Sequence, residues 1–250
     1  MNETDARLAA RLAFEAGQLL LGMQRTSGLS GKELGKAGDA DSNVLLLREL
    51  AATRPDDAVL SEESADSPAR LGADRVWIID PLDGTREYGM PGRPDWAVHV
   101  ALWQRDAQDG RITDAAVSQP ALDAVYASDD AVAITPSGEQ LRFLVSDSRP
   151  PAWAAPVATA LDAELAPMGS AGAKAMAVLR GEAQAYLHAG GQWEWDSAAP
   201  VGVAQAAGLH ASRIDGTPLL YNAAHPYLPD LLICRADLAE LLLQAIADSV

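Results

Sequence analysis

The sequence predicts a mixed α/β fold of the α+β type, with a largely antiparallel sheet in the first half of the chain. Three observations lead to this fold class. Apolar residues recur at helical spacing near the start, and short apolar segments separated by turn residues follow between residues 97 and 146. After Pro150-Pro151, segments typical of helices alternate with segments typical of strands.

The first elements are expected to be two helices separated by a loop, followed by two short buried strands. Leu8, Leu12 and Ala16 lie at helical spacing in the first helix, and Ser42 is the expected N-cap of the second. The glycine-rich stretch between the helices is typical of a polar loop. The expected ranges are 5–24 for the first helix, 28–38 for the loop, 42–53 for the second helix, and 58–60 and 76–79 for the strands.

The next part of the chain has the pattern of an antiparallel meander, because turn residues such as Asp109-Gly110 separate short apolar segments. Its expected strands are 97–103, 112–118, 124–127, 132–134 and 141–145. Arg149-Pro150-Pro151 then breaks the chain, which predicts an N-terminal half at residues 1–148 and a C-terminal half at 149–250. The expected elements of the second half are helices at 152–161, 173–180 and 195–207, strands at 165–168 and 183–188, and a last helix from Asp237.

Composition limits the classes of function. The 250 residues include 19 basic and 35 acidic side chains, so the formal charge of −16 argues against binding nucleic acid or an anionic membrane. The acidity also has a simpler reading, as an aid to solubility or an adaptation to salt. The single cysteine, Cys234, lies in an apolar run and is expected in the core. With no signal peptide or apolar run near the roughly 20 residues of a membrane span, we expect a cytoplasmic protein.

The most informative stretch is Trp77-Ile78-Ile79-Asp80-Pro81-Leu82-Asp83-Gly84-Thr85. An apolar strand here ends in two carboxylates, Asp80 and Asp83, which a strand can hold in fixed positions. Gly84 allows a tight turn in which backbone N–H groups can face an anion. Carboxylates beside such a turn are typical of a site that holds divalent cations next to a phosphate. A metal would also explain how an acidic protein binds an anionic substrate.

Further acidic residues lie at expected loops or strand ends. They are Asp39 in the predicted loop, Glu62-Glu63 after the first strand, and Asp196 at the start of a helix. Taken singly, each has a simpler reading: a turn or helix cap for Asp39 and Asp196, and a solvated turn for the two glutamates. Brought together, they would repel one another strongly without bound metal, and Mg²⁺ prefers such oxygen ligands.

A rival chemistry resembles this motif. Leu82-Asp83-Gly84-Thr85 is similar to the Asp-x-Asp-Gly-Thr loop of haloacid dehalogenase-type phosphatases, which attack phosphorus with an aspartate two residues before the second one. That position is Pro81 here, and Asp80 lies one residue too far back. This spacing argues against a covalent aspartyl-phosphate.

The chain resembles the inositol monophosphatase-like family of Mg²⁺-dependent, lithium-sensitive phosphatases over nearly its whole length. The matching segments are residues 77–85, Trp195-Asp196-Ser197-Ala198-Ala199-Pro200, Gly169-Ser170-Ala171-Gly172-Ala173-Lys174 and Ser61-Glu62-Glu63-Ser64. Within the family, the chain looks most like the CysQ-type 3′(2′),5′-bisphosphate nucleotidases of actinobacterial kind. That narrower resemblance rests on Gln192-Trp193-Glu194-Trp195-Asp196 and the segment from Asp80 to Tyr88.

The resemblance implies a layered αβαβα sandwich, as in inositol monophosphatases and fructose-1,6-bisphosphatases. The first half would bind the metals and the second half the substrate. Two or three Mg²⁺ ions per site are implied, with these ligands: Glu62, Asp80, Asp83, Asp196 and the main-chain carbonyl of Leu82. Asp39 would serve a further metal or its water. The family usually has Thr-x-x-Asp there, whereas this chain has Lys36-Ala37-Gly38-Asp39, so Asp41 remains an alternative.

The implied mechanism is attack by a metal-activated water, with Asp39, Glu62 and Thr85 as the catalytic residues. Thr85, oriented by Asp39, would help to deprotonate the water. The expected substrate contacts are Asp83, Gly84, Thr85, Arg86, Arg149, Gly169, Ser170, Lys174, Trp193 and Asp196. Taken alone, each arginine is better read as a surface residue, and Trp193 could equally be a core or rim residue. We read His188 as a hydrogen-bonded core histidine rather than a substrate contact.

These expectations favour a nucleotidase that removes the 3′-phosphate of adenosine 3′,5′-bisphosphate (PAP), and of its sulfated form PAPS. The alternatives are inositol monophosphatase or fructose-1,6-bisphosphatase activity, or a catalytically silent regulator that binds phosphate or metal. The presence of all the residues implied for catalysis and metal binding argues against a catalytically silent protein. These residues are Glu62, Asp80, Asp83, Thr85 and Asp196. The expected partner is a small phosphorylated molecule, not a nucleic acid polymer or a membrane. The family resemblance also implies that the protein can form a homodimer.

Overall fold

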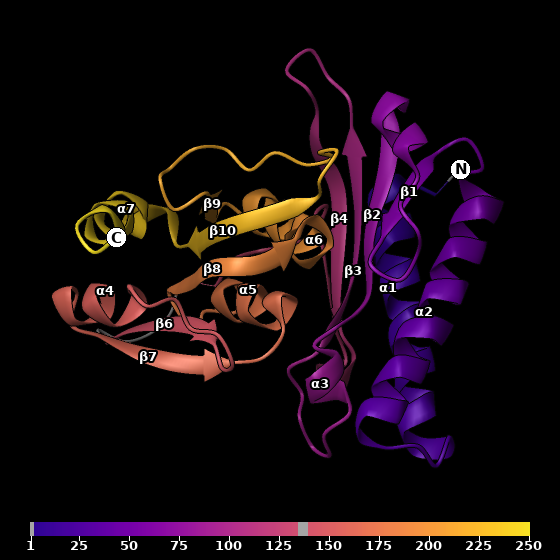
Figure 1. The fold of residues 1–250 in the computed structure, drawn as a ribbon, viewed down its shortest axis with the longest axis horizontal. Coiled ribbons are helices and arrows are strands. Elements are labelled where there is room, and N and C mark those ends of the chain that lie inside the picture. The colour runs from indigo at the N-terminus through magenta and orange to yellow at the C-terminus, as the bar shows by residue number, and fades with distance from the viewer. Residues whose placement is uncertain (1–2, 135–139) are drawn as a thin grey trace.

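The structure is a computed structural model that describes residues 3–134 and 140–250. Two five-stranded sheets alternate with three pairs of helices, so that helices cover both outer faces and fill the space between the sheets. Figure 1 shows the succession from α1 and α2 on one side to α4 and α7 on the other. This arrangement confirms the expected αβαβα sandwich.

The first layer contains α1 (Asp5–Thr26) and α2 (Gly31–Thr53). The hydroxyl of Thr4 accepts a hydrogen bond from the backbone N–H of Arg7 and so caps α1, whose apolar stripe packs on the first sheet. The prediction for α1 is confirmed.

The prediction for α2 is wrong at its N-terminal end, because the expected loop at 28–38 is largely helical. Ser42 is therefore not an N-cap but a buried residue inside the helix, where its hydroxyl donates to the Pro81 carbonyl oxygen at 2.7 Å. The glycines allow close packing rather than a loop. A Cβ atom at Gly35 would lie 2.7 Å from Thr85 Cγ2, and one at Gly38 would lie 2.9 Å from the Tyr88 ring.

The first sheet has the strand order β1-β2-β3-β4-β5. Its strands are β1 (Ala58–Ser61), β2 (Arg75–Asp83), β3 (Ala97–Gln104), β4 (Arg111–Gln119) and β5 (Ala124–Ala127). Only the pair β1 and β2 is parallel, so the sheet is largely antiparallel as expected. The register of β2 against β3 shifts between Asp80 and Asp83, and this irregularity lies at the end of the strand that carries both carboxylates.

Two segments predicted as strands of the meander do not belong to it. Residues 132–134 do not form a strand, and the segment expected at 141–145 is β6 (Leu141–Ser146), which belongs to the second sheet. There β6 pairs in parallel with β7 (Ala163–Met168) and β8 (Ala185–Trp193). The chain thus changes sheets before residue 141, while the division into halves at 148 and 149 stays a prediction.

The second sheet has the order β7-β6-β8-β10-β9. Strands β9 (His210–Ser212) and β10 (Tyr227–Cys234) are additions to the predicted elements, and β8 extends past residue 188. Cys234 is buried in β10, as expected. The helices α4 (Ala154–Ala160) and α7 (Ala239–Ala247) cover the outer face of this sheet.

The central layer contains α5 (Ala171–Leu179) and α6 (Glu194–Ala206), which pack between the sheets in the largest apolar core. Both helices begin beside the end of β2, together with the four-residue helix α3 (Thr85–Tyr88). Within the described ranges, no helix combines the length and the apolar character needed to cross a membrane.

Candidate active site

Strand β2 positions Asp80 and Asp83 on the side of the first sheet that faces α5 and α6. Residues three apart on a regular strand would point to opposite faces, but the irregularity in the β2 register brings both carboxylates to the same side. Both are buried, with 1% and 7% of their surface exposed. Gly84 follows in the left-handed backbone region, with φ of 84°, which only glycine adopts at little cost.

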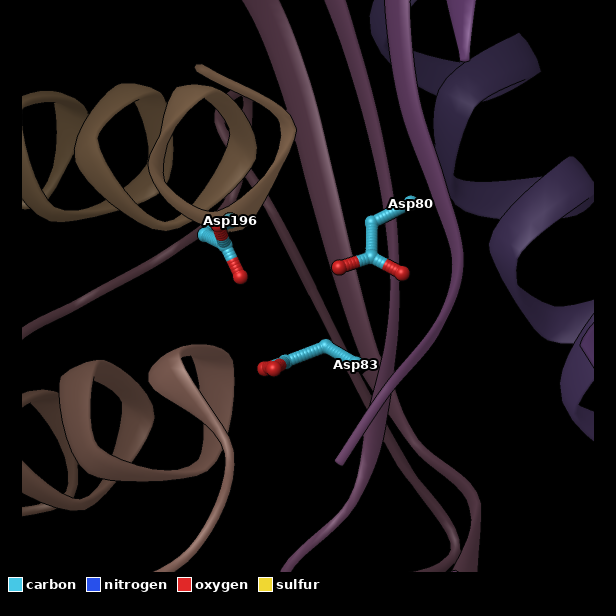
Figure 2. Close-up of side chains that lie close together, drawn as sticks. All are labelled: Asp80, Asp83 and Asp196. Atoms are coloured by element: carbon cyan, nitrogen blue, oxygen red, sulfur yellow. The ribbon is translucent and has the colours of Figure 1, made fainter. Parts of the chain in front are cut away.

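Asp196 approaches the same point from the second half of the chain. It lies in the first turn of α6, where its Oδ2 accepts a hydrogen bond from the backbone N–H of Trp193 at 2.6 Å. Figure 2 shows Asp80, Asp83 and Asp196 converging on one space. One carboxylate oxygen of each lies within 4.8 Å of the other two. The predicted meeting of these three aspartates is thus what the structure shows.

The donors around Asp83 favour its charged form. The hydroxyl of Ser170 donates to Asp83 Oδ2 at 2.5 Å, and the backbone N–H of Gly172 donates to the same oxygen at 2.7 Å. Burial alone would raise the pKa of Asp83, but the His99 ring and these hydrogen bonds outweigh it and lower the pKa to about 2.

The surroundings of the other two aspartates disfavour the charged form of each carboxyl group. Burial, followed by the charges of Glu62 and Asp83, raises the pKa of Asp80 well above its usual range. Burial and the charge of Asp83 raise the pKa of Asp196 to about 7. Among the described residues, the buried Oδ2 atom of Asp80 has no hydrogen-bond partner. An orphaned carboxylate oxygen among carboxylates that repel one another fits a divalent cation with oxygen ligands.

Glu62 stands at the rim of this cluster, just beyond the end of β1. Glu62 and Glu63 are both partly exposed to solvent. Partial burial, followed by the charges of Asp196, Asp39 and Asp83, raises the pKa of Glu62 to about 8. The charges of the aspartates thus act on Glu62, but Glu62 is not part of the group whose carboxylate oxygens lie within 4.8 Å of one another.

Asp39 and Thr85 form the predicted pair. The Thr85 Oγ1 atom lies 3.2 Å from Asp39 Oδ1 and 3.1 Å from the Leu82 carbonyl oxygen, so its hydroxyl hydrogen has two acceptors. Asp39 is on α2 rather than in a loop, and burial with the charge of Glu63 raises its pKa to about 7. Asp41 is exposed on the same helix, so Asp39 is the residue that meets Thr85.

Sequence reasoning missed His99, which lies fully buried on β3 beneath the acidic cluster. Its Nε2 lies 3.2 Å from Asp83 Oδ2, and its Nδ1 lies 3.1 Å from the Trp195 carbonyl oxygen. The contact of Nδ1 is a hydrogen bond, whereas that of Nε2 with the carboxylate is a close polar contact. His99 connects the strand that bears Asp83 with the first turn of α6. A histidine in an otherwise apolar strand is the only sequence signal for it.

A pocket of about 280 Å³ opens beside the carboxylates. Its lining includes nine of the ten predicted substrate contacts: Asp83, Gly84, Thr85, Arg86, Arg149, Gly169, Ser170, Lys174 and Asp196. Trp193 is not part of the lining. Its ring stacks on Trp195, with centroids 5.5 Å apart, and meets the edge of Tyr227.

Two of the cations in the lining are already occupied. Arg86 pairs with Glu87 and Asp147 at 2.5 Å. Lys174 is buried, and its Nζ donates to three backbone carbonyls, those of Met168, Gly169 and Ser170, at 2.6–3.3 Å. Lys174 therefore holds the loop before α5 in place rather than presenting a free ammonium group to the pocket.

Comparisons with known proteins agree with this geometry. The family model described as "Inositol monophosphatase family" matches residues 1–250. Two relatives named 3′-phosphoadenosine 5′-phosphate phosphatase are similar to the chain. The one from Mycobacterium tuberculosis is 58% identical over 94% of this chain and 90% of its own, and the one from Mycobacterium leprae is 56% identical over 98% and 94%.

More distantly related proteins are phosphatases of the same kind or share the fold. The 3′(2′),5′-bisphosphate nucleotidase CysQ of Escherichia coli is 31% identical over 77% of this chain and 81% of its own. Among solved structures, an inositol monophosphatase from Anabaena superposes with a TM-score of 0.77 over 97% of this chain and 95% of the other, at 21% identity. The family model, these relatives and the shared fold lead to one conclusion: the chain belongs to the inositol monophosphatase family.

Proposed function

We propose that the protein is a Mg²⁺-dependent phosphatase that removes the 3′-phosphate of PAP, giving AMP and inorganic phosphate. The observation that carries the proposal is the 56–58% identity, over nearly the whole chain, to relatives named for this substrate. The convergence of Asp80, Asp83 and Asp196 beside a pocket supports the phosphatase chemistry. PAPS, which carries the same 3′-phosphate, is the second expected substrate.

The proposed metal ligands are the carboxylates of Glu62, Asp80, Asp83 and Asp196 and the main-chain carbonyl of Leu82. Two or three Mg²⁺ ions would lower the pKa of the attacking water and neutralise charge on the phosphate and the leaving oxygen. The described residues fit this assignment, because the cluster contains an orphaned buried oxygen on Asp80 and carboxylates with raised pKa values.

The proposed proton path uses Thr85 and Asp39. Thr85 Oγ1 donates toward Asp39 Oδ1, which leaves its lone pairs free to accept a proton from the attacking water. Since the pKa of Asp39 is about 7, its carboxylate can take up a proton near neutral pH. Attack in line with the 3′-oxygen then breaks the P–O bond, and the leaving oxygen gains a proton from solvent.

The proposed phosphate contacts are the backbone N–H groups of Gly84 and Thr85, where the left-handed turn at Gly84 brings the main chain toward the pocket. Ser170 and Lys174 would act indirectly, since Ser170 holds Asp83 and Lys174 holds the loop at residues 168–170. Trp193 keeps no proposed role in substrate binding, because it lies in an aromatic cluster outside the pocket lining.

The test is the release of phosphate from a panel of phosphomonoesters with Mg²⁺, with and without Li⁺. We expect PAP to have the highest kcat/KM and Li⁺ to inhibit. A higher kcat/KM for inositol 1-phosphate or fructose 1,6-bisphosphate would favour the two alternative activities of the family. Release of phosphate from none of them would favour a silent protein that binds phosphate or metal. A cytoplasmic location and a homodimer also remain proposals, and analytical ultracentrifugation tests the dimer.

A further inference from the structure

His188 lies in the active-site pocket with no protein partner, contrary to our reading of it as a hydrogen-bonded core residue. It is on β8, with 4% of its surface exposed, and it contributes to the pocket lining. Within residues 3–134 and 140–250, neither ring nitrogen has a hydrogen-bond partner. A buried polar group without a partner is costly, so this ring is placed to meet a ligand.

Arg149 adjoins His188 in the same pocket. Its Nη1 atom lies only 2.3 Å from the position that a Cβ atom would take at Gly191, so the guanidinium rests where a side chain is absent. Gly191 also has a φ of 74°, which favours glycine. Burial, then the charges of Lys174 and Arg149, lowers the pKa of His188 to about 4, so the ring is neutral near pH 7 and offers one N–H donor.

Arg149 differs from the other two cations of the pocket in its partners. Arg86 is neutralised by Glu87 and Asp147, and Lys174 donates to backbone carbonyls. In the described part of the chain, no carboxylate forms an ion pair with the Arg149 guanidinium. Arg149 is therefore the pocket cation that can still receive an anion.

We propose that Arg149 and His188 bind the second phosphate of a bisphosphate substrate, the one that is not hydrolysed. This inference rests on the proposed function, in which that group is the 5′-phosphate of PAP. The planar guanidinium can donate two parallel hydrogen bonds to phosphate oxygens, and the imidazole N–H can donate a third. Gly191 makes the site possible, because any side chain there would displace the guanidinium.

A neighbouring group suits the sugar of the same substrate. Gln192 donates from its Nε2 to the Tyr186 hydroxyl at 2.8 Å, and its buried Oε1 has no partner in the described ranges. A carbonyl oxygen accepts hydrogen bonds, so it fits a ribose hydroxyl rather than a phosphate. The wall formed by β8 would then contact both the sugar and the second phosphate.

The test compares two substrates that share the hydrolysed group, PAP and 3′-AMP, which lacks the 5′-phosphate. We expect the wild-type protein to prefer PAP in kcat/KM. Loss of a charge-assisted contact corresponds to roughly a 10- to 100-fold effect, so Arg149→Met should lower the PAP to 3′-AMP ratio by about that factor. His188→Phe should lower it by roughly 10-fold, and Arg149→Lys should restore part of it. Arg142→Met, on an exposed arginine paired with Glu164 outside the pocket, is the matched control.

A binding measurement without metal separates recognition from catalysis. By calorimetry in EDTA, Arg149→Met should weaken the binding of AMP and leave that of adenosine unchanged. An unaltered PAP to 3′-AMP ratio in both Arg149→Met and His188→Phe would overturn the inference, and so would an equal loss on both substrates. If the wild-type protein hydrolyses neither substrate, the proposed function fails, and AMP binding alone then decides whether the second phosphate site exists.

Discussion

Replacing His99 by leucine tests whether this ring holds the acidic cluster together. Leucine has a similar volume but cannot bond the Trp195 carbonyl oxygen, which lies 3.1 Å from Nδ1, and it places no polar nitrogen 3.2 Å from Asp83 Oδ2. The hydrogen bond to the Trp195 carbonyl contributes about 0.5–1.5 kcal/mol, and removing the polar nitrogen next to a buried carboxylate costs about 1–3 kcal/mol more. We therefore expect the free energy of unfolding of the metal-free protein to fall by about 2–4 kcal/mol.

The assay is urea unfolding in EDTA, followed by circular dichroism and repeated with saturating Mg²⁺. The loss should be smaller with Mg²⁺, because the ion neutralises the carboxylates that the ring no longer compensates. His210→Leu is the matched control, since His210 is only half-buried and bonds a single hydroxyl, that of Ser212. Its cost should stay below about 1 kcal/mol. A loss equally small for His99→Leu would refute the reasoning.

Three further predictions concern the same site. Asp83→Asn should abolish turnover, measured as phosphate release from PAP, while circular dichroism shows the fold intact; wild-type turnover would contradict the mechanism. In the metal-free protein, the pKa values of about 8 for Glu62 and 7 for Asp196 exceed those of about 4 in an unfolded chain. The stability they provide is therefore complete below about pH 4 and is lost as the pH rises through 7 and 8. Urea unfolding at several pH values should show this fall, and Mg²⁺ should abolish it. Gly172→Ala should lower the free energy of unfolding, measured in urea, by more than about 2 kcal/mol. The new Cβ atom would lie 2.1 Å from Nε2 of the buried His99 ring. Gly22→Ala, with open space around the new atom, should be neutral or slightly stabilising.

The sequence predicted the two carboxylates of β2 in the acidic cluster because the signal for them is local. Asp80, Asp83 and Gly84 lie within one short run, and the strand before them has a clear apolar signal. The strand pattern could not show which sheet β6 would join, because pairing depends on segments far along the chain. It also could not show that His99 lies beneath Asp83, since that contact depends on the register of β2 against β3.

The error at α2 has a different physical cause. Gly31, Gly35 and Gly38 lower the intrinsic preference for a helix, so propensity alone favours a loop there. In the folded protein, the absence of side chains at Gly35 and Gly38 allows α2 to approach Thr85 and Tyr88 closely, and this packing stabilises the helix. Asp39 reaches Thr85 because of that approach. Residues that weaken the helix as an isolated segment therefore place a proposed catalytic carboxylate.

The distance along the chain between the aspartates of β2 and Asp196 of α6 has a consequence for the growing chain on the ribosome. The strands of the first sheet are complete by Ala127, whereas Asp196 and α6 are made almost 70 residues later. Until then, the part of that sheet's apolar face that packs on α6 has no cover, and this is the kind of surface through which nascent chains associate with chaperones or with one another. The cluster of three carboxylates forms only when this face is covered. A newly made chain can therefore assemble this carboxylate cluster only when α6 packs on the first sheet, together with the burial that protects this face from aggregation.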